Sequence, residues 1–170
     1  MNPELLIARM EAFAYHLRLL VKDLPADQAR WRPAKGGMSI LEIVGHLIDR
    51  EMRDFRPRLE LTLRDPERPW PRIEADDGLD ELNYNERNLE RESERFQRER
   101  LKSIQWLKSL GAANWTSTHE EPKLGAIRAG DLMVSWASND ALMSSAIARR
   151  SYDLSQRDAP GFTSVYAGEW

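Results

Sequence analysis

The sequence contains no cysteine. This absence excludes disulfide bonds, a thiolate nucleophile and any metal site built on cysteine sulfur. It also favours a cytoplasmic protein, because structural disulfides belong mainly to oxidising compartments.

Long hydrophobic runs and an excess of positive charge are missing too. No stretch approaches the ~18 uninterrupted apolar residues that a membrane-spanning helix needs. The N-terminal sequence NPELLIARM shows neither the basic start nor the apolar run of a signal peptide. The formal net charge is -3 and the isoelectric point about 5.7, which argues against nucleic-acid binding. We therefore expect a cytoplasmic protein that engages neither a membrane nor nucleic acid.

Familiar catalytic motifs are also absent: there is no glycine-rich phosphate loop, H-E-x-x-H zinc pair or serine nucleophile elbow. The sequence has only three histidines, His16, His46 and His119. His16 adjoins an apolar row and is typical of a structural or surface residue. His119 is expected in a loop, from which it could reach a pocket rim. His46 lies about 200° from its helix's apolar stripe, so periodicity assigns it to the surface, although such a residue can still line a cleft between helices.

What the sequence does contain is amphipathic helical periodicity. The first helical pattern follows Asn2, a capping residue, and ends near Pro25. The second begins at the capping box formed by Ser39 and Glu42 and reaches about Leu63.

Pro57 lies inside the second pattern and predicts a kink or a break there. A proline-rich segment without periodicity, Arg64–Gly78, follows. The third pattern runs from about Leu79 to Leu110, and the fourth from near Asp131 to about Tyr152. Between these two, the sequence TSTHEEPKLGAIR predicts a turn or a short hairpin. The tail carries three aromatic residues, from which we expect it to pack against the fold: Phe162, Tyr166 and Trp170.

The chain of 170 residues suits a single domain spanning residues 1–170. Four amphipathic helices predict an all-α four-helix bundle. About 15 extended residues reach ~50 Å, whereas a helix of about 25 residues is only ~37 Å long. The segment after the second helix can therefore run the length of the bundle and let the third helix lie parallel to the second, although a slack loop would also fit.

The inward row of the last helix has an unusual middle. Leu132 and Trp136 are followed by Asn139 and Met143, an amide and a thioether one turn apart on a face that should meet the core. An active site, a lost site and a packing choice would all give this pattern.

Three stretches carry a resemblance to a known family. The run WRPAKGGMSILEIVGHLIDREMRDF, then YNERNLERESERFQRERLKSIQWLKSL, then HEEPKLGAIRAGDLMVSWASND resemble the DinB/YfiT-like superfamily of metal-dependent four-helix-bundle proteins, and YAGEW ends the match. The resemblance covers nearly the whole chain. It implies an up-down-down-up bundle, and a homodimer is expected because relatives often pair through helix faces.

The resemblance also implies where a metal would bind. Family members use three histidines: one on the second helix and an H-x-x-x-H pair on the fourth, whose spacing puts both imidazoles on one face. His46 matches the histidine of the second helix, but Asn139 and Met143 occupy the two positions of the histidine pair. An amide and a thioether hold Zn or Ni poorly, so we expect no bound metal ion. If the site does bind a metal, we expect the ion to be Zn or Ni.

Carboxylates could in principle rebuild the site. Asp140 follows Asn139 directly, Asp49 lies near His46, and Asp76 and Asp77 stand in the proline-rich segment. Each is at a large helical angle from the family positions or on a loop, which disfavours a rebuilt site.

Two functions follow. The favoured one is a bundle with a degraded metal site that is non-catalytic or binds a small polar molecule. Its pocket would be formed by the following residues: His46, Trp136, Asn139, Met143 and, at the rim, His119. The alternative is a metal-dependent hydrolase or low-molecular-weight-thiol S-transferase with a substituted ligand set, or acid/base chemistry by His46 with a carboxylate.

Overall fold

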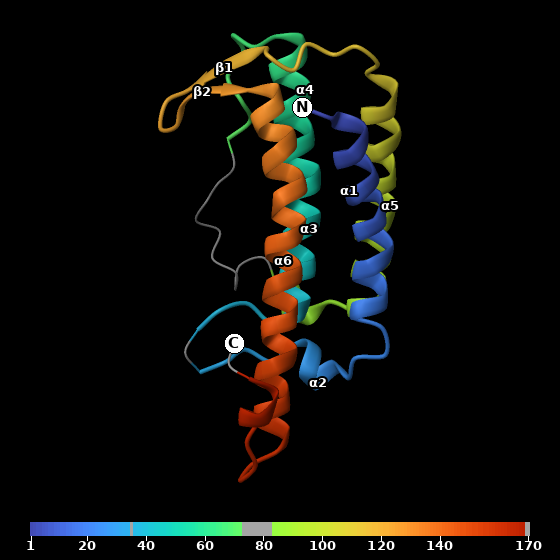
Figure 1. Cartoon of the computed structure of the whole chain (residues 1–170), viewed down its shortest axis with the longest axis vertical. Coiled ribbons are helices and arrows are strands. Elements are labelled where there is room, and N and C mark those ends of the chain that lie inside the picture. Colours follow the sequence, from blue (N-terminus) through green and yellow to red (C-terminus); the bar gives the residue numbers. More distant parts are fainter. Residues whose placement is uncertain (35, 73–82, 169–170) are drawn as a thin grey trace.

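The computed structural model describes residues 1–34, 36–72 and 83–168. Helices dominate it (Figure 1). The main helices are α1 (Pro3–Leu20), α3 (Ile40–Asp49), the π-helix η1 (Arg50–Phe55), α4 (Arg56–Arg64), α5 (Leu89–Ser109) and α6 (Ala129–Asp158). The short elements are α2 (Ala26–Ala29), η2 (Tyr84–Glu86), β1 (Thr118–Glu121), β2 (Gly125–Arg128) and η3 (Val165–Ala167).

The bundle has the expected up-down-down-up topology. In Figure 1, α1 and α6 run from the top of the molecule to the bottom, whereas the continuous run α3–η1–α4 and the helix α5 both run upward. The second and third long helices are therefore parallel neighbours. Residues 73–82 of the segment that joins them lie outside the described residues.

Local capping determines where the helices begin. The Asn2 side chain accepts a hydrogen bond from the Leu5 amide at 3.1 Å, and Ser39 and Glu42 form the predicted reciprocal capping box. The third long helix begins at Leu89, later than the predicted Leu79, because Asn88 caps it. A 3-10 turn precedes that cap, and residues 79–82 are not among those described.

Pro57 neither breaks nor ends its helix. It stands in the first turn of α4, and the six residues before α4 form the π-helix η1. A proline cannot donate the usual backbone hydrogen bond, and a widened turn lets the helical run continue past it. The run therefore stays helical from Ile40 to Arg64.

The predicted hairpin is present, but the predicted packing of the tail is wrong. Strands β1 and β2 pair antiparallel, with Thr118 opposite Arg128. Helix α6 continues beyond the predicted end at Tyr152, and Figure 1 shows its last turns extending past the other helices. The tail is thereby carried away from the core: Phe162 is 83% exposed and Tyr166 fully exposed. Trp170 lies outside the described residues.

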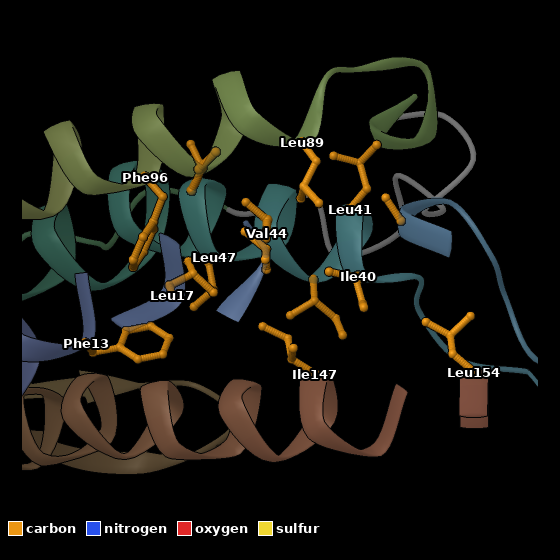
Figure 2. Close-up of a cluster of buried hydrophobic side chains, with 14 residues drawn as sticks. Phe13, Leu17, Ile40, Leu41, Val44, Leu47, Leu89, Phe96, Ile147 and Leu154 are labelled. Carbon is orange, nitrogen blue, oxygen red and sulfur yellow. The ribbon is translucent and has the colours of Figure 1, made fainter. Parts of the chain in front are cut away.

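The interior consists of two apolar clusters, one in each half of the bundle. Figure 2 shows the cluster of the lower half, where Phe13, Leu17, Val44 and Phe96 from three helices converge. The other cluster is built around Met10, Phe55, Leu59, Ile104, Met133 and Trp136. Between the two clusters lies a layer of buried charged side chains, which we call the polar layer: Glu51, Arg100 and Asp140.

Candidate functional site

His46 lies in α3, one turn after the capping box, and is half-buried. Burial lowers the pKa of its imidazole below 6.5, and the positive charge of Arg50 lowers it further, whereas Asp49 and Asp54 act in the opposite direction. The imidazole is therefore neutral at neutral pH. A neutral imidazole is the form that binds metals and that accepts a hydrogen bond from a ligand.

Trp136 faces the interior of the bundle. Its side chain is 1% exposed and stacks on Phe55, with ring centroids 5.8 Å apart. The indole Nε1 donates a hydrogen bond to Glu51 Oε2 at 2.9 Å. Trp136 thus belongs to the second apolar cluster and donates to the layer of buried charges beside it.

Asn139 and Met143 lie one turn apart on α6, which packs beside α3. Asn139 is partly exposed, and Met143 packs against the apolar cluster of the lower half. Packing therefore accounts for the thioether of Met143. The amide of Asn139 sits at the partly exposed edge of the same face.

His119 is placed at the opposite end of the α3–α4 run from His46. It is 5% exposed, its Nδ1 lies 2.7 Å from the Pro66 carbonyl oxygen, and its ring stacks on Trp70 at 4.4 Å. Both partners follow the end of α4, at the top of Figure 1, whereas His46 is near the start of the α3–α4 run. The structure therefore does not group His119 with His46, and its contacts are those of a residue that attaches the hairpin.

The sequence indicates that Arg100 lies on the inward side of α5, but not which residues it bonds. Arg100 donates two hydrogen bonds to Asp140, at 2.6 and 2.9 Å, and a third to Glu51 at 2.9 Å. The guanidinium also lies over the ring of Phe96, at 4.9 Å from its centroid. Arg100 falls between Phe96 and Ile104 on the inward row of α5, which is the signal for its inward position. Glu51 gives no comparable signal.

The charges of this layer do not balance. Two carboxylates, Glu51 and Asp140, face one guanidinium, and Glu51 Oε1 has no hydrogen-bond partner. Burial raises the pKa of Asp140, and Glu51 adds to this, although Arg100 opposes it. Burial alone would lower the pKa of Arg100, but Glu51 and Asp140 raise it above its ordinary value, so the guanidinium stays charged.

The carboxylates that might rebuild a metal site already have other partners. Asp140 is held by Arg100, as described. Asp49 accepts a hydrogen bond from the Tyr84 hydroxyl and lies 3.6 Å from the Arg53 guanidinium. Asp76 and Asp77 lie outside the described residues. Among the described residues, no group of three or more His, Asp or Glu side chains is placed to hold a metal ion.

The family positions therefore offer a weak donor set. One imidazole, one amide oxygen and one thioether have no charge, and thioether sulfur is a soft ligand that suits neither Zn nor Ni. By this chemistry, His46, Asn139 and Met143 do not fit a tightly bound divalent ion.

A cavity of about 310 Å³ opens one helical turn from His46. Its walls include Arg32, Glu42, Tyr84 and Asn85. Glu42 is fully buried and is held by Arg32 and by the Ser39 amide, and Asn85 accepts a hydrogen bond from the Ser39 hydroxyl at 2.7 Å. The cavity thus has fixed polar walls.

This geometry defines an up-down-down-up four-helix bundle with a histidine on its second long helix. The chain belongs to the DinB superfamily, whose sequence model matches residues 9–142.

A solved structure with the same fold is YfiT from Bacillus subtilis, described as a probable metal-dependent hydrolase with an unusual four-helix bundle topology. The two superpose with a TM-score of 0.78 and 17% sequence identity, over 91% of this chain and 88% of YfiT. No curated protein sequence matches significantly. No helix in the described part of the chain is both long and apolar enough to cross a membrane.

Proposed function

We propose that this chain is a DinB-superfamily protein that works without a bound metal ion, as a binding protein for a small polar molecule. One observation carries this proposal: Asn139 and Met143 stand where the family resemblance implies two imidazoles. Met143 moreover packs against the apolar cluster of the lower half, so its side chain has a structural role.

The partners of the neighbouring carboxylates support the same conclusion. A carboxylate that replaced a missing histidine ligand would first have to lose its present partners. These are Arg100 for Asp140, and Tyr84 and Arg53 for Asp49. Freeing Asp140 would take two hydrogen bonds away from the buried guanidinium of Arg100, which is unfavourable.

The ligand contacts would come from the polar side of α3. His46 is neutral and half-exposed, so it can both donate and accept a hydrogen bond. The cavity walled by Arg32 and Glu42 lies one turn away along the same helix. A small molecule with both donors and acceptors suits these groups.

Elemental analysis tests the metal-free proposal. Tag-free protein would be incubated with Zn or Ni, desalted and measured beside untreated protein. We expect metal well below one ion per chain in both samples. Near-stoichiometric metal that disappears in His46→Ala would contradict the proposal.

A matched gain-of-function variant makes a negative result informative. The double substitution Asn139→His and Met143→His restores the three-imidazole set, so we expect this variant to retain close to one ion per chain under the same treatment. Replacing two exposed residues of α6, Ser138→His and Leu142→His, gives the same spacing on the outer face and should bind no ion this tightly.

The competing function is the metal-dependent hydrolase or thiol S-transferase with a substituted ligand set. It is supported by the structural similarity to YfiT. An assay of transfer to a low-molecular-weight thiol, with and without added Zn or Ni, separates the two. Metal-stimulated turnover that is lost in His46→Ala would favour the enzyme.

A further inference from the structure

A second cavity lies at the lower end of the bundle in Figure 1, where α1 ends and α5 begins. Its volume is about 270 Å³, close to the lower limit of the pockets that hold small molecules. Its walls come from the end of α1 and the turn after it, from α2 and α3, and from the segment that leads into α5. We call it the α1–α5 cavity. His46 is not among the residues that line it.

One part of the wall of this cavity is apolar. Its residues all belong to the apolar cluster of the lower half or pack against it: Val21, Leu24, Ala29, Leu41 and Leu89. Figure 2 shows Leu41 and Leu89 within that cluster. Because these side chains are close-packed on their other sides, this part of the wall keeps its shape and offers apolar surface to a ligand.

The rest of the wall is rich in charge, with an excess of basic side chains. Four are basic and two are acidic: Arg18, Lys22, Arg30 and Arg87, against Asp23 and Glu90. The whole chain has a net charge of -3, so this positive excess is a local feature. Positive charge beside an apolar, partly enclosed surface attracts anions.

Arg30 is held in place without being neutralised. Its Nη2 donates a hydrogen bond to the Arg87 carbonyl oxygen at 3.4 Å, which links the end of α2 to the residue that follows η2. Within the described residues its side chain makes no ion pair. A guanidinium has five N–H donors in a planar fork. Arg30 can therefore bind an anion through two parallel hydrogen bonds without first losing a carboxylate partner.

Two basic side chains of α1 and the turn after it, Arg18 and Lys22, continue this part of the wall. Lys22 Nζ lies 4.0 Å from an Asp23 carboxylate oxygen, and both side chains are mostly exposed. Arg18 donates to Glu94 at 3.0 Å, also at the surface. Exposed ion pairs of this kind contribute little to stability, so these two cations are available to a bound anion.

We propose that the α1–α5 cavity binds a small phosphate monoester whose organic part is apolar. The apolar part of the wall suits the organic group. A phosphate monoester carries close to two negative charges at neutral pH, which matches the excess of two basic side chains. A carboxylate would leave one positive charge unmatched. The small volume favours a single small molecule over a nucleic-acid strand.

NMR titration of the isotope-labelled full chain with phenyl phosphate tests this proposal. Inorganic phosphate, phenol and benzoate serve as comparison ligands, because they lack the apolar group, the charge and the second charge, respectively. We expect the amide signals of Val21, Ala29 and Leu89 to shift, and phenyl phosphate to bind about 10-fold or more tightly than each comparison ligand. Equal affinity for benzoate or for inorganic phosphate would contradict the proposal.

A matched pair of variants separates a site from general attraction by charge. Arg18→Gln with Lys22→Gln removes two cations that line the α1–α5 cavity and not the cavity near His46. We expect it to weaken phenyl phosphate binding by about 10-fold or more. Arg9→Gln with Lys108→Gln is the control, because it removes the same charge from exposed positions. Lys108, like Arg18, forms an ion pair between α1 and α5.

Arg30 lines both cavities, so its variant is compared with His46→Ala. We expect Arg30→Gln to weaken phenyl phosphate binding about 10-fold and His46→Ala to leave it unchanged. Circular dichroism should confirm that the variants are folded. Three outcomes would overturn the proposal: no shifted amide signals around the cavity at millimolar phenyl phosphate, an equal loss of binding in the control double variant, or loss of binding in His46→Ala. A metal ion bound at His46 would contradict the proposed function and leave this test unaffected.

Discussion

Arg100 joins carboxylates from two other helices in the middle of an apolar interior. Glu51 comes from η1 and Asp140 from α6, and both are almost fully buried together with Arg100 itself. Burying three charges is unfavourable unless each is bonded, and the bonds here are short and partly bidentate. Removing the guanidinium alone is therefore far worse than removing all three charges.

Arg100→Met should lower the free energy of unfolding by about 3–5 kcal/mol, because it leaves two buried carboxylates without a counter-charge. Urea titration at neutral pH measures this. The triple variant Glu51→Gln, Arg100→Met, Asp140→Asn removes every charge and should recover most of the loss. If the triple variant were no more stable than Arg100→Met, the uncompensated charge would not be the cause.

Gly45 faces the Tyr84 ring so closely that a Cβ atom would overlap it. Gly45→Ala should therefore displace Tyr84, break its bond to Asp49 and lower stability by about 1–3 kcal/mol. Elsewhere in a helix, the same substitution stabilises by about 0.5–1 kcal/mol. In a Tyr84→Ala background, Gly45→Ala should thus become neutral or stabilising. Equal effects in both backgrounds would show that the two residues are not coupled.

His46 predicts a pH dependence with a definite sign. Because burial lowers its pKa below 6.5 in the folded protein, the unfolded chain takes up the proton first as the pH falls. The histidine therefore has no effect on stability well above pH 6.5 and destabilises the fold progressively below it.

NMR titration of the His46 imidazole should give a midpoint below 6.5, and Arg50→Gln should move it upward. The stability lost on acidification should be smaller in His46→Gln. A midpoint above 6.5 would mean that Asp49 and Asp54 outweigh burial and Arg50.

At the scale of elements, the His119 side chain is one of the groups that attach the hairpin β1–β2 to the bundle. His119 is bonded to the Pro66 carbonyl and stacks on Trp70, whose Nε1 donates to the Thr62 hydroxyl at 3.1 Å. These contacts tie the strand pair to the end of α4.

His119→Ala should lower stability by about 1–3 kcal/mol, the combined size of one hydrogen bond and one ring stack, and should speed amide exchange in both strands. Glu120→Ala, at the exposed neighbouring position, should do neither. The His46 titration should be unchanged in both variants. A shift of that titration in His119→Ala alone would mean that the two histidines are coupled.

Elements whose limits depend on local chemistry could be predicted from the sequence. The caps at Asn2 and Ser39 are set by residues within three positions of each other, and the apolar periodicity identified each long helix. The π-helix before Pro57 and the exposed tail could not be predicted, because they depend on how far each helix extends against its neighbours.

At the scale of the whole molecule, the polar layer separates two apolar clusters and bonds all four long helices at one level, because Arg100 also donates to the Met10 carbonyl oxygen of α1 at 3.4 Å. Apolar side chains can pack when one helix is shifted along its neighbour, whereas a bidentate ion pair forms in one alignment only. The layer therefore fixes how the helices are aligned along the bundle axis. Its pairing was beyond the sequence, because Arg100 bonds Glu51 and Asp140, which are 49 and 40 residues away along the chain.

The place of α1 between α5 and α6 has a consequence for synthesis of the protein. The buried side of α1, with Phe13 and Leu17, is covered by helices that begin at Leu89 and Ala129. At roughly 5–20 residues per second, the ribosome needs several seconds to deliver them. During that interval the apolar side of the first helix is exposed without its native partners. The nascent chain therefore has to avoid contacts between its early helices and other chains until the last helix has emerged.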